Sequence, residues 1–358
     1  MPTPRPLLLL TLFALLALPS SASAVIGGQA ASQPYPHMAA MTANDGEWAG
    51  CGGSLVRADW VLTAAHCVEG ADEQDVGWLF GTHDLLSPGA GEEIPAAEVI
   101  VHERWGDDDN TDASSFDVAL VRLARPATKG TPIRIASPQT EKGLWAPGET
   151  ATVIGWGSRE PVGVLYSESS LQELDVPMID DDECSTFYPG LPIIGAFDPE
   201  TMVCAGYTEG TKDSCYGDSG GPLMVPDASG ALVQVGVVSW GNQCALPTQY
   251  GVYSRVADAP LYDWIASKLP AAQTTTTTTT TTSTAAPKSS TSAPAAQPTP
   301  TPAAATPALA TPAAKAVRAK KRTARQRCVA KARKLRGSKR RRALKRCAKV
   351  VKAKTRRA

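Results

Sequence analysis

Three short stretches of this sequence carry side chains that together can do nucleophilic chemistry. Residues 213–222 read DSCYGDSGGP and place Ser219 among glycines, which permit a sharp turn. Such a turn can aim consecutive backbone N–H groups at one point beside the serine oxygen, as an oxyanion site requires. A serine hydroxyl is a weak nucleophile and needs a base. His66, within TAAHC, and Asp117, within the apolar stretch FDVAL, are the candidates for activating it.

The three stretches, in the order His, Asp, Ser, resemble those of the chymotrypsin/trypsin family of serine proteases. The resemblance covers residues 25–269. It implies that Ser219 is the nucleophile, that His66 is the general base and acid, and that Asp117 orients the imidazole. It also implies an oxyanion hole formed by the backbone N–H groups of Gly217 and Ser219.

The same resemblance implies a specificity pocket for a cationic side chain. Asp213 stands where the family has the base of this pocket, and a carboxylate buried there favours Arg or Lys. The other residues that match substrate-binding positions are Ser214, Ser239, Trp240, Gly241 and Gly251. The two glycines leave the walls open for a long side chain, and the first serine can help to bind Lys. Residues 239–241 match the strand that pairs with an extended peptide or protein substrate, and Tyr216 stands at the rim.

The beginning of the chain predicts export. Residues 1–24 contain one charged side chain, an apolar run at 7–18 that is too short to span a membrane, and the small-residue cleavage site ASA. The following residues, VIGG, resemble the mature N-terminus of the family, where the freed amino group pairs with the carboxylate before the nucleophile. Here these groups belong to Val25 and Asp218. Because no pro-segment intervenes, we expect activity on export without a separate activating protease.

The cysteines also fit an exported protein. Eight cysteines allow 105 full pairings, so the residues alone do not choose among them. The family pattern implies the disulfides Cys51–Cys67, Cys184–Cys204 and Cys215–Cys244. The first would brace the turn that carries His66, and the third would brace the walls of the specificity pocket.

No metal centre and no cofactor are predicted, because the chain has no C-x-x-C motif and only four histidines. Calcium is the one alternative. Residues 82–93 resemble the family's calcium loop, with Asp84 and Glu92 near ligand positions. Thr82 stands where a carboxylate is expected, and the loss of one hard oxygen ligand should weaken calcium binding.

The pattern around these motifs is all-β. Gly, Pro and Asp separate short apolar or alternating runs at 53–56, 60–62, 118–121, 151–154 and 232–238. The family implies two six-stranded antiparallel barrels, with the histidine and the aspartate on the first and the serine on the second. A closing helix is predicted over residues 261–269, where Leu261, Trp264, Ile265 and Lys268 follow helical spacing. Pro260 suits its first turn.

The charged residues divide the chain into an acidic body and a basic tail. Its 358 residues have a net charge of zero, but residues 25–270 hold all 35 acidic side chains and 11 Lys and Arg, which gives −24.

Residues 271–314, rich in Thr, Pro and Ala, predict a disordered and O-glycosylated linker. Residues 315–358 carry 22 Lys and Arg and no acid. Cys328 and Cys347 lie symmetrically about residues 337–338 of this tail, which favours a helical hairpin stapled by a disulfide. A disordered polycation is the alternative.

The sequence therefore predicts a secreted, monomeric trypsin-like endopeptidase with no transmembrane span. Its domains are a signal (1–24), a protease domain (25–270), a linker (271–314) and a basic tail (315–358). The alternative is a surface-anchored binding protein, in which the tail holds an anionic cell-wall polymer or another polyanion and proteolysis is auxiliary. The tail could also dock on the acidic body of its own chain.

The tail is predicted to be a substrate of its own enzyme, protected by its disulfide. A protease binds extended strands, so a helix must open before it is cut, and opening is easiest where few apolar contacts hold it. Intact mass measured over time should show tail loss that requires Ser219 and is faster in Cys328→Ser than in wild type. Equal rates in those two proteins would remove the protective role of the disulfide. Equally fast loss in Ser219→Ala would assign the cleavage to another protease.

Overall fold

The computed structural model describes residues 25–43, 47–87, 89, 91–106, 114–158, 169–191 and 195–270. The signal (1–24), the linker (271–314) and the basic tail (315–358) lie outside these residues. The predictions made for them, including the Cys328–Cys347 disulfide, therefore stay predictions. Across the described residues, no helix is both long and apolar enough to span a membrane.

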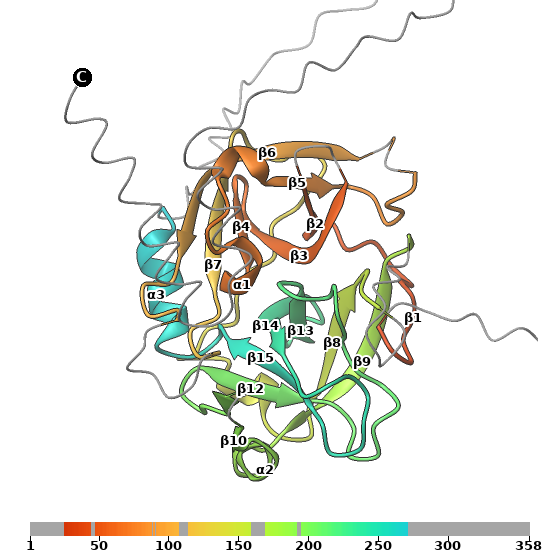
Figure 1. Ribbon diagram of the computed structural model, residues 1–358, viewed down its shortest axis with the longest axis vertical. Helices are drawn as coiled ribbons and strands as arrows, with labels where there is room; N and C mark the ends of the chain where they lie inside the picture. The colour runs from red at the N-terminus through yellow and green to blue at the C-terminus, as the bar shows by residue number, and fades with distance from the viewer. Residues whose placement is uncertain are drawn as a thin grey trace, which may run out of the picture. The chain divides into compact units, whose positions relative to one another are not determined.

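Six antiparallel strands close the first barrel, drawn in red to yellow in Figure 1. Their bounds are β2 (Met38–Thr42), β3 (Trp48–Arg57), β4 (Trp60–Thr63), β5 (Gly77–Phe80), β6 (Glu92–Val101) and β7 (Ala119–Leu123). They are hydrogen-bonded in the order β2-β3-β4-β7-β6-β5. The interior is filled by side chains such as Leu55, Trp78 and Val121, all of them buried. Alternation of such residues with polar ones produced the strand prediction.

A second set of six antiparallel strands closes on itself in the order β9-β12-β15-β14-β13-β8, because β8 also pairs with β9. Their bounds are β8 (Thr150–Gly155), β9 (Gln172–Ile179), β12 (Met202–Ala205), β13 (Pro222–Pro226), β14 (Leu232–Trp240) and β15 (Gly251–Arg255). The short strand β1 (Gln29–Ala30) adds to the edge of β9. The predicted pair of six-stranded barrels is confirmed.

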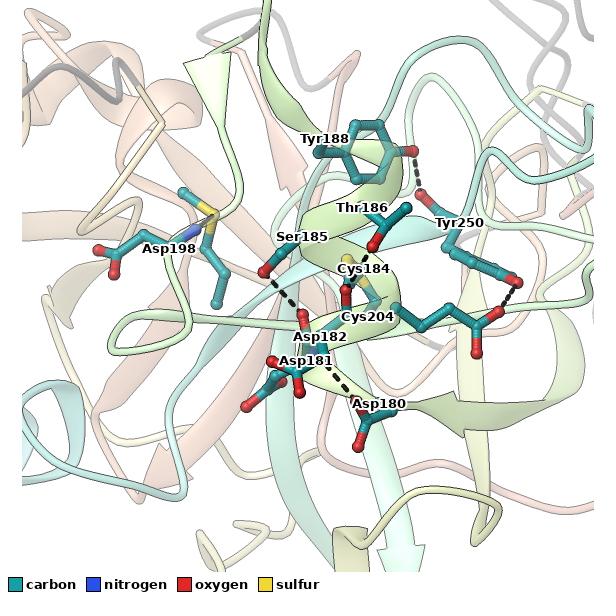
Figure 2. Close-up of a disulfide and its surroundings, with 12 residues drawn as sticks. Asp180, Asp181, Asp182, Cys184, Ser185, Thr186, Tyr188, Asp198, Cys204 and Tyr250 are labelled. Carbon is teal, nitrogen blue, oxygen red and sulfur yellow. Dashed lines mark hydrogen bonds between the residues drawn. A yellow bond between two sulfur atoms is a disulfide. The ribbon is translucent and has the colours of Figure 1, made fainter.

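The remaining elements are short. They are α1 (Ala65–Val68), η1 (Glu73–Asp75), η3 (Lys142–Trp145), α2 (Asp181–Phe187), β10 (Pro189–Leu191), β11 (Gly195–Ala196) and α3 (Leu261–Lys268). Asp180 caps the N-terminus of helix α2, because its carboxylate accepts the backbone N–H of Asp182 at 2.9 Å. The disulfide Cys184–Cys204 then ties α2 to β12 of the second barrel (Figure 2).

Buried polar groups join the two barrels. Ser54 of β3 donates its hydroxyl to Gln234 of β14 at 2.6 Å, and both side chains are buried. Gln234 in turn donates to the carbonyl of Gly236 at 3.0 Å, so its amide is paired on both sides. Leaving such groups unpaired in the interior would cost stability. The pairing therefore fixes how the barrels meet.

Helix α3 spans Leu261–Lys268, one residue shorter than predicted. Its apolar face is buried, as its spacing indicated. Trp264 also reaches the segment that follows β6. Its indole N–H donates to Glu103 at 2.6 Å, and its ring lies 4.8 Å from that of His102. The helix therefore packs on the part of the first barrel that leads to Asp117.

The segment considered above as a calcium loop is bound by a cation from another part of the chain, the segment that follows β7. The guanidinium of Arg125 donates to one carboxylate oxygen of Glu92, and the backbone N–H groups of Thr128 and Lys129 donate to the other at 2.7 and 2.9 Å. Burial alone would raise the pKa of Glu92, but these donors lower it to about 2. Asp84 likewise accepts a backbone N–H of its own loop at 2.9 Å. Both oxygens of Glu92 and one oxygen of Asp84 are therefore already engaged by donors of the protein, which disfavours them as calcium ligands.

We expect Arg125 to stabilise this loop without calcium. Arg125→Ala should lower the melting temperature by about 2–4 °C, which corresponds to about 1 kcal/mol because the arginine is half exposed and solvent screens the pair. Arg122→Ala is the matched control, since it removes the same charge from an exposed pair with Glu98 and should shift the melting temperature by less than about 2 °C. A fall in the wild-type melting temperature on chelation of calcium would contradict the assignment.

Candidate active site

The carboxylate of Asp117 is buried at the meeting of the two barrels. It accepts the backbone N–H of His66 at 2.9 Å and the imidazole Nδ1 of the same residue at 2.7 Å. From the second barrel, the hydroxyl of Ser239 donates to it at 2.6 Å. Burial by itself lowers the pKa of His66, but the charge of Asp117 and their hydrogen bond outweigh it and raise this pKa above 6.5. The pair thus stabilises an imidazolium at position 66.

The backbone around Asp117 is held in an unusual conformation. Phe116 has a backbone φ of 60°, which residues other than glycine rarely adopt and which costs about 1–3 kcal/mol. The guanidinium of Arg104 covers its ring at 4.0 Å, and the ring of His102 lies 4.7 Å away. The hydroxyl of Ser254 donates to the carbonyl of Asp117 at 2.7 Å. These contacts fix the direction of the carboxylate.

Ser219 lies on a tight turn between β12 and β13, and backbone hydrogen bonds within the turn hold it closed. The N–H of Asp218 donates to the carbonyl of Cys215, and the N–H of Gly221 donates to the carbonyl of Asp218, each at 2.9 Å. Gly217 has a φ of +100°, which favours glycine. Among the described residues, no acceptor is found for the N–H groups of Gly217 and Ser219, so both remain available to an oxygen of a substrate. Ser219 and His66 line the same cavity.

The carboxylate of Asp218 lies behind this turn and is completely buried. The backbone N–H groups of Gly157 and Cys215 each donate to it at 2.8 Å. Burial raises the pKa of Asp218 to about 7, although these two donors oppose the rise. Val25 is also fully buried, and the next residue, Ile26, forms a β-bridge with Asp213. The segment that begins at Val25 therefore enters the interior beside the turn.

Asp213, which is buried, lines a cavity of about 270 Å³. One of its oxygens accepts the N–H of Ala245 at 3.0 Å, while the other is buried without a hydrogen-bond partner among the described residues. Burial raises the pKa of Asp213 to about 8; the Ala245 N–H opposes this and the charge of Asp218 adds to it. A Cβ at Gly251 would lie 2.8 Å from the unpaired oxygen, so glycine keeps this carboxylate accessible. The site is suited to a cation.

The predicted substrate-binding residues all lie around this cavity. Its lining includes Ser214, Tyr216, Ser239, Trp240, Gly241 and Gly251. The hydroxyl groups of Ser214 and of buried Tyr253 form a hydrogen bond at 3.1 Å. The hydroxyl of Ser239 donates a hydrogen bond to Asp117. The backbone of Ser239 is therefore the part of this residue that a substrate could pair with. Tyr216 stands at the rim and is 50% exposed.

Helix α2 supports the walls of this cavity from behind, a role that sequence reasoning missed. The buried ring of Tyr188 packs edge-on against Trp240, with centroids 4.9 Å apart. Its hydroxyl donates to the carbonyl of Tyr250 at 2.6 Å (Figure 2). The hydroxyl of Tyr250 donates to Glu183 of α2 at 2.5 Å. A single tyrosine without a motif gives no signal of this kind in the sequence.

Two further disulfides brace the site. Cys51–Cys67 links β3 to α1, which carries His66, and Cys215–Cys244 crosses the cavity wall. Together with Cys184–Cys204 they are the pairs that the family resemblance implied. The disulfides therefore tie the histidine turn, the serine turn and the pocket wall to the strands behind them.

Comparison with known proteins places this architecture in a family. Residues 25–265 match the model of the family described as Trypsin. A trypsin of Saccharopolyspora erythraea is 35% identical over 248 residues, which cover 69% of this chain and 99% of the relative. An anionic trypsin of Canis lupus familiaris is 37% identical over 221 residues, which cover 62% of this chain and 80% of the relative. The chain belongs to the trypsin family and is a trypsin-like serine endopeptidase.

Proposed function

We propose that this endopeptidase cleaves peptide bonds after Arg or Lys. The observation that carries the proposal is the buried carboxylate of Asp213, which lines the cavity with one oxygen unpaired. An unpaired buried charge is costly, and a guanidinium or ammonium group of a substrate would supply the missing partner. Three related proteins that match this chain are also trypsins by name.

The contacts support the following catalytic roles. With Nδ1 of His66 donating to Asp117, Nε2, which lies 3.7 Å from the sulfur of Cys67, is the nitrogen that would accept the proton of Ser219. The serine oxygen bonds to the scissile carbonyl carbon, and the π electrons move to the carbonyl oxygen, which the N–H groups of Gly217 and Ser219 stabilise. Collapse restores the carbonyl, and the leaving amine takes the proton from His66. A water molecule then repeats the sequence and releases the acid.

Activation is proposed to follow export. Cleavage before Val25 would place a free ammonium group on a segment that is already buried beside the turn. Asp218, buried and with backbone donors only, would gain the cationic partner that a buried carboxylate needs. The signal-like residues 1–24 and the three disulfides support secretion.

The alternative of a surface-anchored binding protein is not favoured, because the family match covers residues 25–265 and identifies an enzyme. The basic tail lies outside the described residues. Its retention on an anionic polymer, an association with the cell surface and the monomeric state all stay predictions.

Substitution of Asp213 tests the specificity. Asp213→Ser should lower kcat/KM for Arg and Lys anilides by about 10²- to 10⁴-fold, because the buried cation loses its counter-charge. Asp263→Ser, which removes an exposed carboxylate of α3, should leave kcat/KM unchanged. Ser219→Ala should abolish cleavage of every substrate. A wild-type preference for Phe or Leu would refute the proposed specificity.

A second test concerns the N-terminus. The exported enzyme should begin at Val25, and two residues added before it should reduce activity by about 10²-fold or more, since Asp218 then lacks its ion pair. Asp218→Asn in the enzyme that begins at Val25 should show a similar loss. N-terminal sequencing identifies the first residue of each form, and titration of active sites gives the fraction of each form that is active. Full activity in the extended form would exclude the ion pair as the activating contact.

A further inference from the structure

Trp48, the first residue of β3, lies across the barrel interface from the serine turn. The pairing of β2 with β3 is irregular just after it, where Ala40 opposes Gly52 but Thr42 opposes Trp48. Such an irregularity bends a strand and redirects its side chains. The indole N–H donates to the carbonyl of Cys51 at 3.1 Å, which holds the ring in one orientation.

The ring packs on Gly217. A Cβ built on this glycine would lie 2.7 Å from Cη2 and 3.3 Å from Cζ2 of Trp48, and 3.0 Å from the Cα of Gly157. The side of Gly217 on which a Cβ would stand is therefore filled by an indole ring and by the backbone of a second glycine. Among the glycines of the turn, Gly217 is the one whose built Cβ meets an aromatic ring. The Cβ built on Gly220 meets the hydroxyl of Thr63, and the one built on Gly221 meets backbone carbonyls.

We propose that Trp48 is a positioning residue that fixes the direction of the Gly217 N–H. The inference rests on the proposed function, in which this N–H binds the oxyanion. Gly217 has a φ of +100° and no side chain of its own to resist rotation of the neighbouring peptide. A donor stabilises a developing charge most when it is already aimed before the reaction. The indole supplies the packing that the glycine lacks.

The effect of Trp48 is confined to the oxyanion side of the site. The cavity that holds Asp213 is lined by other residues, and Trp48 lies behind Gly217, outside that lining. Loss of the ring should therefore weaken interactions with a tetrahedral oxygen and spare the binding of a cation. A general loss of structure would weaken both.

Two inhibitors separate these effects. A peptidyl arginine aldehyde adds to Ser219: the serine oxygen bonds to the aldehyde carbon, the C=O π electrons move to oxygen, and the hydroxyl proton passes to His66. The resulting oxygen occupies the oxyanion site. Benzamidine binds only through its cation at Asp213. Both inhibitors use the Asp213 site and only the aldehyde fills the oxyanion site, so the ratio of the two inhibition constants reports on the oxyanion site that Gly217 and Ser219 form.

In Trp48→Ala we expect the aldehyde to bind about 10- to 100-fold more weakly, with kcat for an Arg anilide reduced by a similar factor and benzamidine affinity retained. Trp48→Phe keeps a ring against Gly217 but loses the N–H bond to Cys51, so less than about tenfold should be lost. Tyr262→Ala, which truncates a half-buried aromatic side chain on α3, is the matched control and should change neither constant.

Each outcome is decisive. An unchanged ratio of the two constants in Trp48→Ala, or equal weakening of both inhibitors, would overturn the positioning role. A loss in Trp48→Phe as large as that in Trp48→Ala would also overturn it, because packing would then not be the cause. Wild-type enzyme that binds neither inhibitor would refute the proposed function itself, a result distinct from the other three.

Discussion

The carboxylate of Asp117 is the group on which the arrangement of this site depends. A buried charge is tolerated only when hydrogen-bond donors surround it. Here the donors come from both barrels: the backbone and imidazole of His66 from the first, and the hydroxyl of Ser239 from the second. Any relative movement of the barrels would take at least one donor away from the charge. The electrostatic requirement of one side chain thus holds the histidine in place and the barrels together.

The serine turn shows a second use of buried carboxylates. Asp213 and Asp218 lie five residues apart, and backbone N–H groups satisfy each only in part. Burial raises the pKa of both, to about 8 and about 7. A carboxylate with a raised pKa is one whose charged form lacks stabilisation, so each position favours a cation. Asp218 accepts backbone N–H groups only, and Asp213 lines the cavity. In the proposed function, one turn thus offers two carboxylates to cations, Asp218 to the chain's own amino group and Asp213 to a substrate.

Much of this could be predicted from the sequence, because the signals are local. Alternating runs indicated the strands, helical spacing indicated α3, and the residues around Ser219 carried the family resemblance. The contacts that were missed join segments far apart in the chain. Ser239 and Asp117 are 122 residues apart, and nothing in either stretch predicts their hydrogen bond. Glu92 was considered only as a ligand of a weakened calcium loop, because its loop was compared with a family pattern. The Arg125 that engages it lies 33 residues later.

The missed contacts share a physical role: they hold the backbone in place where the chemistry requires it. Tyr188 packs behind Trp240 and donates to the carbonyl beside Gly251, so it acts on two walls of the cavity at once. Trp48 acts in the same way on Gly217. Glycine is required at positions 217 and 251 because a side chain would clash with the indole or with Asp213, and its presence leaves the backbone without support of its own. Large aromatic side chains from neighbouring elements supply that support. In the proposed function, an oxyanion site made of backbone N–H groups depends on side chains that pack behind the backbone, because only a rigid donor stabilises charge without reorganisation.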